Sequence, residues 1–442
     1  MSGLVSPAEL RARFAAALSD MYQAEVPQYG ALLTLVNDVN RATLAADPKL
    51  ERSLAASGEL GRIAGERHGA IRVGTADELR SIARAFRLMG MEPVGYYDLA
   101  TAGVPVHSTA FRPVETDELA ASPFRVFTSL LRLDLIDDPD LRTEAAEILG
   151  RRQIMTEEAL SLLAEGEAAN GLDEQEVARF LPALLETFRW HQRATIGEEI
   201  YDRLLASHRL VADVVSFPGP HINHLTPRTL DIDAAHRRMA ELGFGPKVEI
   251  EGPPRRDIPI LLRQTSFKAL SEPVRFPGGG TGSHTARFGE IEQRGAALTR
   301  EGRARYDRML AGGDAAGAAG LPDDPDALRR EELAFFRYRA ADARYVPGAT
   351  ASLEALIMDG ALVATPITYE DFLPVSAAGI FRSNLGDETR AGYAATGSRA
   401  AFEQALGDSV RDEFALYERE QAASLRGLER AFGWTEGSVT PR

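Results

Sequence analysis

Two histidine-led segments of the chain follow the same residue plan. The first begins at His68 and has Arg72 four residues later; the second begins at His224 and has Arg228 four residues later. A capped helix and a Gly-x-x-Pro turn follow each segment. Such a duplication predicts two copies of one module that face each other. Histidines contributed by two facing modules are a natural pair of ligands for a metal ion.

An acidic strand near the end of the second copy could supply a third ligand. Glu290 and Glu292 fall on one face of this strand because side chains alternate along a strand. Two histidines and one glutamate form the facial triad that binds Fe(II) and keeps coordination positions open. The pattern alone does not separate Glu290 from Glu292. The matching strand of the first copy, 124–133, has no acid or histidine, so a three-ligand site that favours oxygen activation is expected.

The repeat also separates candidate site residues from histidines with a structural role. His221 competes with His224 but points to the opposite face, and only His224 is followed by an arginine at the fourth position. Arg72 shares the face of His68, where its forked guanidinium is suited to hold a substrate carboxylate. The histidines without a counterpart in the repeat are expected to be structural: His107, His191, His208, His236 and His284.

The elements around these residues predict an α+β fold. Each copy has the order βαβββ, and the two copies are expected to form a central curved sheet around the metal site. The expected divisions are N-terminal helices in 1–65, a first module in 66–137, a helical insert in 138–213, a second module in 214–298, and C-terminal helices with a strand segment that completes the active site in 299–442.

Three further predictions concern the secondary structure of the second module and of the C-terminal part. Residues 247–252 are predicted to form a strand of the second module, and residues 273–284 a flexible loop before its last strand. Residues 328–342 are predicted to form a helix.

Composition narrows the class of protein. The 442 residues include no cysteine, which excludes disulfides, thiolate catalysis and cysteine-bound metals. A net charge of −15 offers no basic stripe for nucleic acid. No apolar run approaches the roughly 20 residues of a membrane span, and the first residues lack the pattern of a signal peptide. We therefore expect a cytoplasmic protein with small-molecule partners and no membrane partner; oligomeric state is left open.

Four segments carry a resemblance to a known family. The chain resembles the 2-oxoadipate dioxygenase/decarboxylase family, also called 2-hydroxyglutarate synthases, of the vicinal oxygen chelate superfamily. The resemblance covers nearly the whole chain. The segments that carry it are 65–75, 221–229, 288–295 and 368–381.

The resemblance implies a site and an activity. It implies that His68, His224 and Glu292 bind Fe(II), which resolves the choice between the two glutamates. It implies conversion of 2-oxoadipate and O2 to 2-hydroxyglutarate and CO2, a reaction suited to lysine degradation. The alternatives are another metalloenzyme of the superfamily, such as an extradiol dioxygenase or a glyoxalase-type isomerase, and a non-catalytic small-molecule binding protein.

The resemblance also implies how the substrate is held. Arg72 would bind a carboxylate of the 2-oxo diacid. Val375 and Ser376, in the C-terminal segment, would contact the substrate as well.

Overall fold

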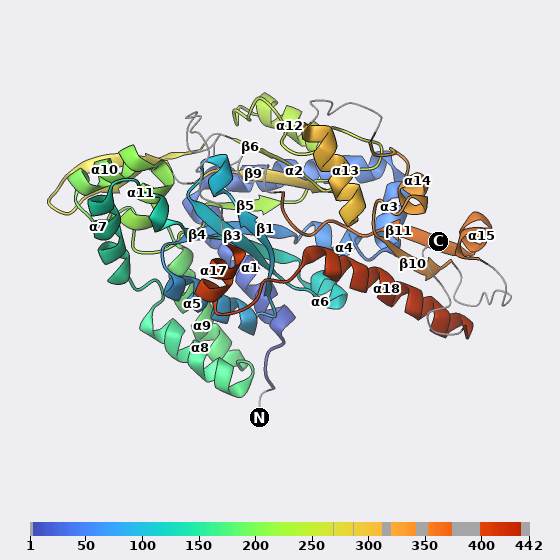
Figure 1. The fold of residues 1–442 in the computed structure, drawn as a ribbon, viewed down its shortest axis with the longest axis horizontal. Helices are drawn as coiled ribbons and strands as arrows, with labels where there is room; N and C mark the ends of the chain where they lie inside the picture. Colours follow the sequence, from blue (N-terminus) through green and yellow to red (C-terminus); the bar gives the residue numbers. More distant parts are fainter. Residues whose placement is uncertain are drawn as a thin grey trace.

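A mixed β-sheet forms the centre of the molecule. The computed structural model describes residues 3–267, 269–285, 287–311, 320–341, 352–373 and 398–434. The central strands are β1 (Arg67–Val73), β2 (Glu92–Asp98), β3 (Val106–Arg112), β4 (Phe124–Leu131) and β5 (His224–Pro227). They are arranged in the order β2-β3-β4-β1-β5. Figure 1 shows β1, β3, β4 and β5 at the centre of the molecule. β1 is parallel to β4 and antiparallel to β5.

The first module has the predicted order. Helix α5 (Ala76–Leu88) connects β1 to β2, and the short helix α6 (Thr116–Ala121) precedes β4. Thr75 caps α5 by accepting a hydrogen bond from the backbone N–H of Glu78. The strand order places the last strand of the module beside the first.

The second module repeats this arrangement only in part, because its strands are divided among separate sheets. Its further elements are α12 (Ile232–Glu241), β6 (Leu262–Ser266), β7 (Ser271–Arg275), β8 (Thr281–Thr285) and β9 (Glu290–Arg294). β9 pairs with β6 and also lies beside β5, with a parallel bridge between Arg228 and Glu292. In both modules the last strand therefore runs beside the first and parallel to it. The predicted α+β fold with two vicinal-oxygen-chelate-like modules is confirmed.

Two details of the second module differ from the prediction. Residues 247–252 form no strand and contribute only an isolated bridge at Glu251; Val248 is 96% exposed, so the segment has no buried face to hold it in a sheet. The predicted loop at 273–284 is instead largely a hairpin, in which β7 and β8 pair across a turn with positive φ at Gly278 and Gly279.

A third difference lies in the C-terminal part. The predicted helix at 328–342 is divided between α14 (Pro325–Arg330) and strand β10 (Phe336–Ala340), which pairs with β11 (Leu362–Pro366). Glu332 has a φ of 55°, which a helix cannot accommodate. Phe336 and Tyr338 are buried at the two-residue spacing of a strand.

Helices from three parts of the chain surround the sheet. The N-terminal helices are α1 (Pro7–Glu25), α2 (Pro27–Ala46), α3 (Pro48–Ala56) and α4 (Leu60–Ile63). The helical insert comprises α7 (Pro139–Gly150), α8 (Glu157–Ala169), α9 (Glu174–Leu185), α10 (Glu198–Ser207) and α11 (Arg209–Ser216). The C-terminal part adds α13 (Arg300–Ala311), α14, α15 (Leu353–Met358), α17 (Arg399–Leu406) and α18 (Glu413–Phe432).

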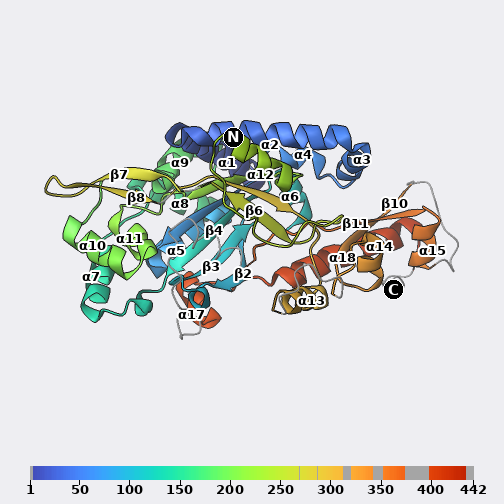
Figure 2. The same ribbon diagram turned by 90° about the horizontal axis from the view of Figure 1, so that it is seen from above.

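The views in Figures 1 and 2 show how these groups are placed. α1 and α2 lie along one side of the sheet, α10 and α11 lie at one end of the molecule, and β10, β11, α15 and α18 lie at the other. Within the part of the chain that the structure describes, no helix is both long and apolar enough to cross a membrane.

Candidate metal centre and substrate site

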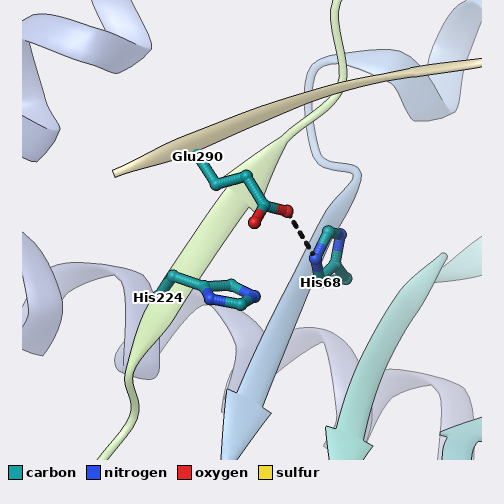
Figure 3. Close-up of side chains that lie close together, drawn as sticks. All are labelled: His68, His224 and Glu290. Atoms are coloured by element: carbon teal, nitrogen blue, oxygen red, sulfur yellow. Dashed lines mark ion pairs between the residues drawn. The ribbon is translucent and has the colours of Figure 1, made fainter. Parts of the chain in front are cut away.

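Three buried side chains of the metal-binding type meet where β1, β5 and β9 run side by side. One donor atom each from His68, His224 and Glu290 lies within 4.8 Å of the others (Figure 3). The strand register explains this meeting, because Ala70 of β1 lies opposite His224 and His68 lies opposite Thr226. Directly paired residues point to the same face of a sheet, so both histidines project to one side.

His68 lies between two carboxylates. Its Nε2 is 3.1 Å from Oε1 of Glu290, and its Nδ1 is 2.8 Å from Oε2 of Glu292. Both glutamates are fully buried. Glu292 also accepts two hydrogen bonds of 2.9 Å from Arg294. The two glutamates that share a face of β9 therefore approach opposite nitrogens of one imidazole.

The donor set fits a divalent transition metal. Glu290 accepts hydrogen bonds through Oε1 from Gln264 (2.7 Å) and Thr226 (3.2 Å). Its other oxygen, Oε2, and Nδ1 of His224 are buried without a hydrogen-bond partner among the described residues. Buried polar atoms without partners are costly unless a ligand satisfies them. Two imidazoles and a carboxylate are ligands that Fe(II) and related metals accept.

The charges around the site act differently on the two histidines. Burial lowers the pKa of His224 to about 4, and the positive charges of His68 and Arg72 add to the lowering. Burial also opposes the charge of His68, but Glu292 and Glu290 outweigh it and raise the pKa of that imidazole. The pKa of Glu292 falls to about 2, because the neighbouring cations outweigh the effect of burial. The glutamate is thus a carboxylate at neutral pH, and His224 has an unprotonated nitrogen available.

A buried ion network adjoins the site on the side of Glu292. It consists of arginines and glutamates from the N-terminal helices, the sheet and the C-terminal part. Its arginines are Arg62, Arg125, Arg228 and Arg294, and its further glutamates are Glu59, Glu66 and Glu370. Sequence reasoning did not identify this network. The two-residue spacing could have pointed to part of it, since Glu66 shares the face of His68 and Arg228 that of His224.

The C-terminal part of the chain closes one side of the site through Phe372. Its ring lies edge-on to His68, with centroids 5.0 Å apart. The preceding residues are anchored by buried ion pairs, Glu370 to Arg62 at 2.9 Å and Asp371 to Arg112 at 2.7 Å. The predicted substrate residues Val375 and Ser376 lie outside the described residues.

Arg72 lies further along the face of β1 that carries His68. Its Nη1 donates a 2.5 Å hydrogen bond to Oδ2 of Asp213, and both side chains are buried. His221, the competing ligand candidate, lies 3.3 Å from the same carboxylate. The structure therefore brings His68 and His224 together with Glu290, places Glu292 at the other nitrogen of His68, and places Arg72 against Asp213.

Comparisons with known proteins agree on one family. The family model described as 2-oxoadipate dioxygenase/decarboxylase matches residues 14–384. A protein of that name from Pseudomonas putida is 54% identical over 97% of this chain and 97% of its own length. One from Escherichia coli is also 54% identical, over 96% of this chain and 99% of its own.

A solved structure agrees as well. The crystal structure of the hydroxyglutarate synthase from Pseudomonas putida in complex with 2-oxoadipate superposes with a TM-score of 0.90 at 52% identity, covering 98% of this chain and 100% of that one. The sequence match, the shared fold and the buried His-His-Glu cluster lead to one conclusion. The chain belongs to the 2-oxoadipate dioxygenase/decarboxylase family.

Proposed function

We propose that the protein is an Fe(II)-dependent dioxygenase that converts 2-oxoadipate and O2 to 2-hydroxyglutarate and CO2. The observation that carries the proposal is a buried His-His-Glu cluster within a chain 54% identical to relatives of that name. The stoichiometry balances without a second organic cosubstrate. One oxygen atom enters the carboxylate that forms at the former keto carbon, and the other becomes the new hydroxyl group of the same product. We place this reaction in lysine degradation in the cytoplasm.

We propose that His68 and His224 hold the metal together with one glutamate of β9. Glu292 is the third ligand that we propose, following the family resemblance; its carboxylate is ionised and lies 2.8 Å from His68. Glu290 is the alternative, because its carboxylate lies within reach of both histidines. The glutamate that is not a ligand would face the other nitrogen of His68 and orient the ring, as carboxylates commonly do beside metal-bound histidines.

The bound Fe(II) would supply open coordination positions for the 2-oxo acid and the redox chemistry that activates O2. The chain supplies the surroundings. Phe372 lies against His68 and packs on Phe127, with ring centroids 5.1 Å apart, which keeps water from that side of the cluster. Arg72 would bind the far carboxylate and so fix the carbon chain relative to the metal. Val375 and Ser376, shortly after Phe372 in the chain, would complete the substrate contacts.

Oxygen consumption tests the activity directly. The protein is loaded with Fe(II) without oxygen, and O2 uptake and CO2 release are then measured with a series of 2-oxo acids. We expect equal amounts of O2 consumed and CO2 released, with 2-oxoadipate the best substrate. If no 2-oxo acid stimulates O2 uptake, the proposal is wrong. An extradiol dioxygenase or a glyoxalase-type isomerase would release no CO2.

Matched variants decide between the two glutamates. Glu290→Gln and Glu292→Gln remove the same charge from neighbouring positions of one face. The variant of the true ligand should lose most of its iron, as measured by elemental analysis. The other variant should retain iron with affinity reduced by roughly 10- to 100-fold, the usual effect of losing an orienting partner. Iron loss only in Glu290→Gln would overturn the assignment of Glu292.

A further inference from the structure

Asp213 is the centre of a second buried cluster next to the candidate metal site. Its carboxylate, on α11, is 2% exposed and receives Arg72 from β1. Nε2 of His284, on β8, lies 2.9 Å from Oδ1 of Asp213, and Nε2 of His221 lies 3.3 Å from the same oxygen. The hydroxyl of Tyr201, on α10, lies 2.8 Å from Nδ1 of His284. Side chains from the helical insert, the hairpin and the sheet thus converge on one carboxylate.

The cluster fixes where the Arg72 guanidinium lies. An arginine side chain has many rotamers, and a buried carboxylate on one edge of the guanidinium restricts them. Asp213 is itself held, because both of its oxygens are engaged, Oδ2 by Arg72 and Oδ1 by the two histidines. Such an arrangement orients a binding group before the ligand arrives, which reduces the cost of binding.

The position of Arg72 suits the far end of a diacid. A strand rises about 3.3 Å per residue, so the Cα atoms of His68 and Arg72 are about 13 Å apart on one face. Across the sheet, Ala70 lies between them and opposite His224. A 2-oxo acid bound through its keto end near the two histidines would extend its chain along this face. Its second carboxylate would then approach the guanidinium of Arg72.

We propose that Asp213 is a positioning residue that makes the site selective for dicarboxylic 2-oxo acids, by holding Arg72 where the second carboxylate binds. The inference rests on the proposed function, because it takes the substrate to be a 2-oxo diacid. It gives the helical insert and the β7–β8 hairpin a role in substrate selectivity. These elements supply Asp213 and His284, which orient a residue of the sheet.

Binding measurements on the Fe(II)-loaded full chain without oxygen test this proposal. The probes are 2-oxoadipate and 2-oxohexanoate, which has the same chain length but no second carboxylate. The wild-type protein should bind the diacid more tightly. Asp213→Asn should weaken diacid binding about 10- to 100-fold, the usual scale for a hydrogen bond to a charged group, with monoacid binding changed less than about two-fold.

Further variants separate positioning from charge and from folding. Asp213→Glu keeps the charge but moves the carboxylate, so it should also lose diacid selectivity. Tyr201→Phe removes one hydroxyl from the far end of the cluster, is a mild change for the fold, and should reduce selectivity only a few-fold. Asp233→Asn is the matched control, because Asp233 pairs with Arg263 at 2.7 Å in another part of the second module. It should leave selectivity unchanged.

Each outcome bears on the proposal. Unchanged or tighter diacid binding in Asp213→Asn would overturn it, and so would an equal loss for both probes, which would mean that Asp213 only maintains the fold. Equal binding of both probes by the wild-type protein would overturn it too. Failure of the proposed function is a separate result, seen as absence of O2 uptake with every 2-oxo acid while diacid selectivity in binding is still measurable.

Discussion

Arg72 and Arg228 occupy the same place in the repeat but lie at opposite ends of the site. β1 and β5 are antiparallel, so an arginine four residues after each histidine is carried away from its counterpart. Arg72 meets the carboxylate of Asp213, which also contacts His221 and His284. Arg228 meets two carboxylates, Glu59 and Glu66, each at 2.8 Å.

This difference shows how a duplicated pattern acquires two functions. At the Arg228 end the guanidinium lies within the network of buried arginines and glutamates and holds the N-terminal helix α4 against the sheet. At the Arg72 end the guanidinium pairs with Asp213, which His221 and His284 also contact. Equivalent residues therefore serve stability at one end and, as we propose, substrate binding at the other.

The largest expected effect concerns the histidines, for which the two modules should be equally necessary. His68→Ala and His224→Ala should each lose most of the bound iron, because each removes one proposed ligand. Activity with 2-oxoadipate should fall by more than the roughly 10- to 100-fold that loss of an orienting partner causes. Iron content and O2 uptake are the measurements. His236→Ala is the control, since His236 contacts Thr265 on the outer side of the module; iron retained in His224→Ala would contradict the prediction.

The next largest effect should be a difference in stability between variants of the two arginines. Arg228→Met removes one of the two arginines, Arg62 and Arg228, that contact both Glu59 and Glu66. Because both carboxylates are buried, this loss should reduce the free energy of unfolding by about 3–5 kcal/mol, as is usual when one partner of a buried ion pair is removed. Arg72→Met should cost about 1–3 kcal/mol, because two histidines still contact Asp213. Urea unfolding at pH 7 measures both. An equal or reversed order would remove the distinction between the two ends.

A smaller effect, on substrate binding, is expected from Asp371, which lies where the C-terminal part meets the Arg228 end of the site. Asp371 accepts hydrogen bonds of 2.7 and 3.0 Å from Arg112 and one from Tyr417. Asp371→Asn should loosen the segment that places Phe372 against His68, raising KM for 2-oxoadipate roughly 10-fold with iron content unchanged. Tyr417→Phe should have the same effect to a smaller degree. Loss of iron in Asp371→Asn would show that the segment supports the metal ligands instead.

The sequence was sufficient for the parts of the site that depend on local periodicity. The repeat and the alternation of strand side chains predicted that His68 and His224 would meet, and that Glu290 and Glu292 would face them. The choice between the glutamates depends on which nitrogen of His68 faces the metal. Gln264 donates a hydrogen bond to Glu290, and Arg294 donates hydrogen bonds to Glu292. The contact between Glu290 and Gln264 joins two strands, β9 and β6, so no spacing within one strand encodes it.

The features that the sequence did not predict have a common cause: they depend on contacts between segments that are far apart in the chain. Asp213 belongs to a helix whose pattern indicates only a buried face, and it meets Arg72 through tertiary packing. β10 has a composition compatible with a helix, and pairing with β11 makes it a strand. Segment 247–252 has strand-like residues, but none of them is fully buried, so little holds the segment in the sheet.

The smallest expected effect compares two buried acids whose pKa values shift in opposite directions. Asp213 has a pKa held well below its usual range, because His221 and Arg72 outweigh the effect of burial. Glu413, at the start of α18, has a pKa raised to about 7 by burial and by the charge of Asp371. Since the ordinary pKa of this carboxyl group is 4.5, the folded protein binds the extra proton between these values. Its contribution to stability is therefore complete below about pH 4.5 and is lost as the pH rises through 7.

Replacing that acid tests the sign of this shift. Glu413→Gln cannot ionise, so its stability relative to the wild-type protein should increase between pH 5 and pH 8. The increase should be about 1–2 kcal/mol, less than the full shift implies because the side chain is partly exposed. Urea unfolding of both proteins at the two pH values measures it. A relative stability that is the same at pH 5 and pH 8 would show that the carboxyl group of Glu413 titrates normally. The negative charge beside Asp371 would then be neutralised within the fold, as it is at Asp213.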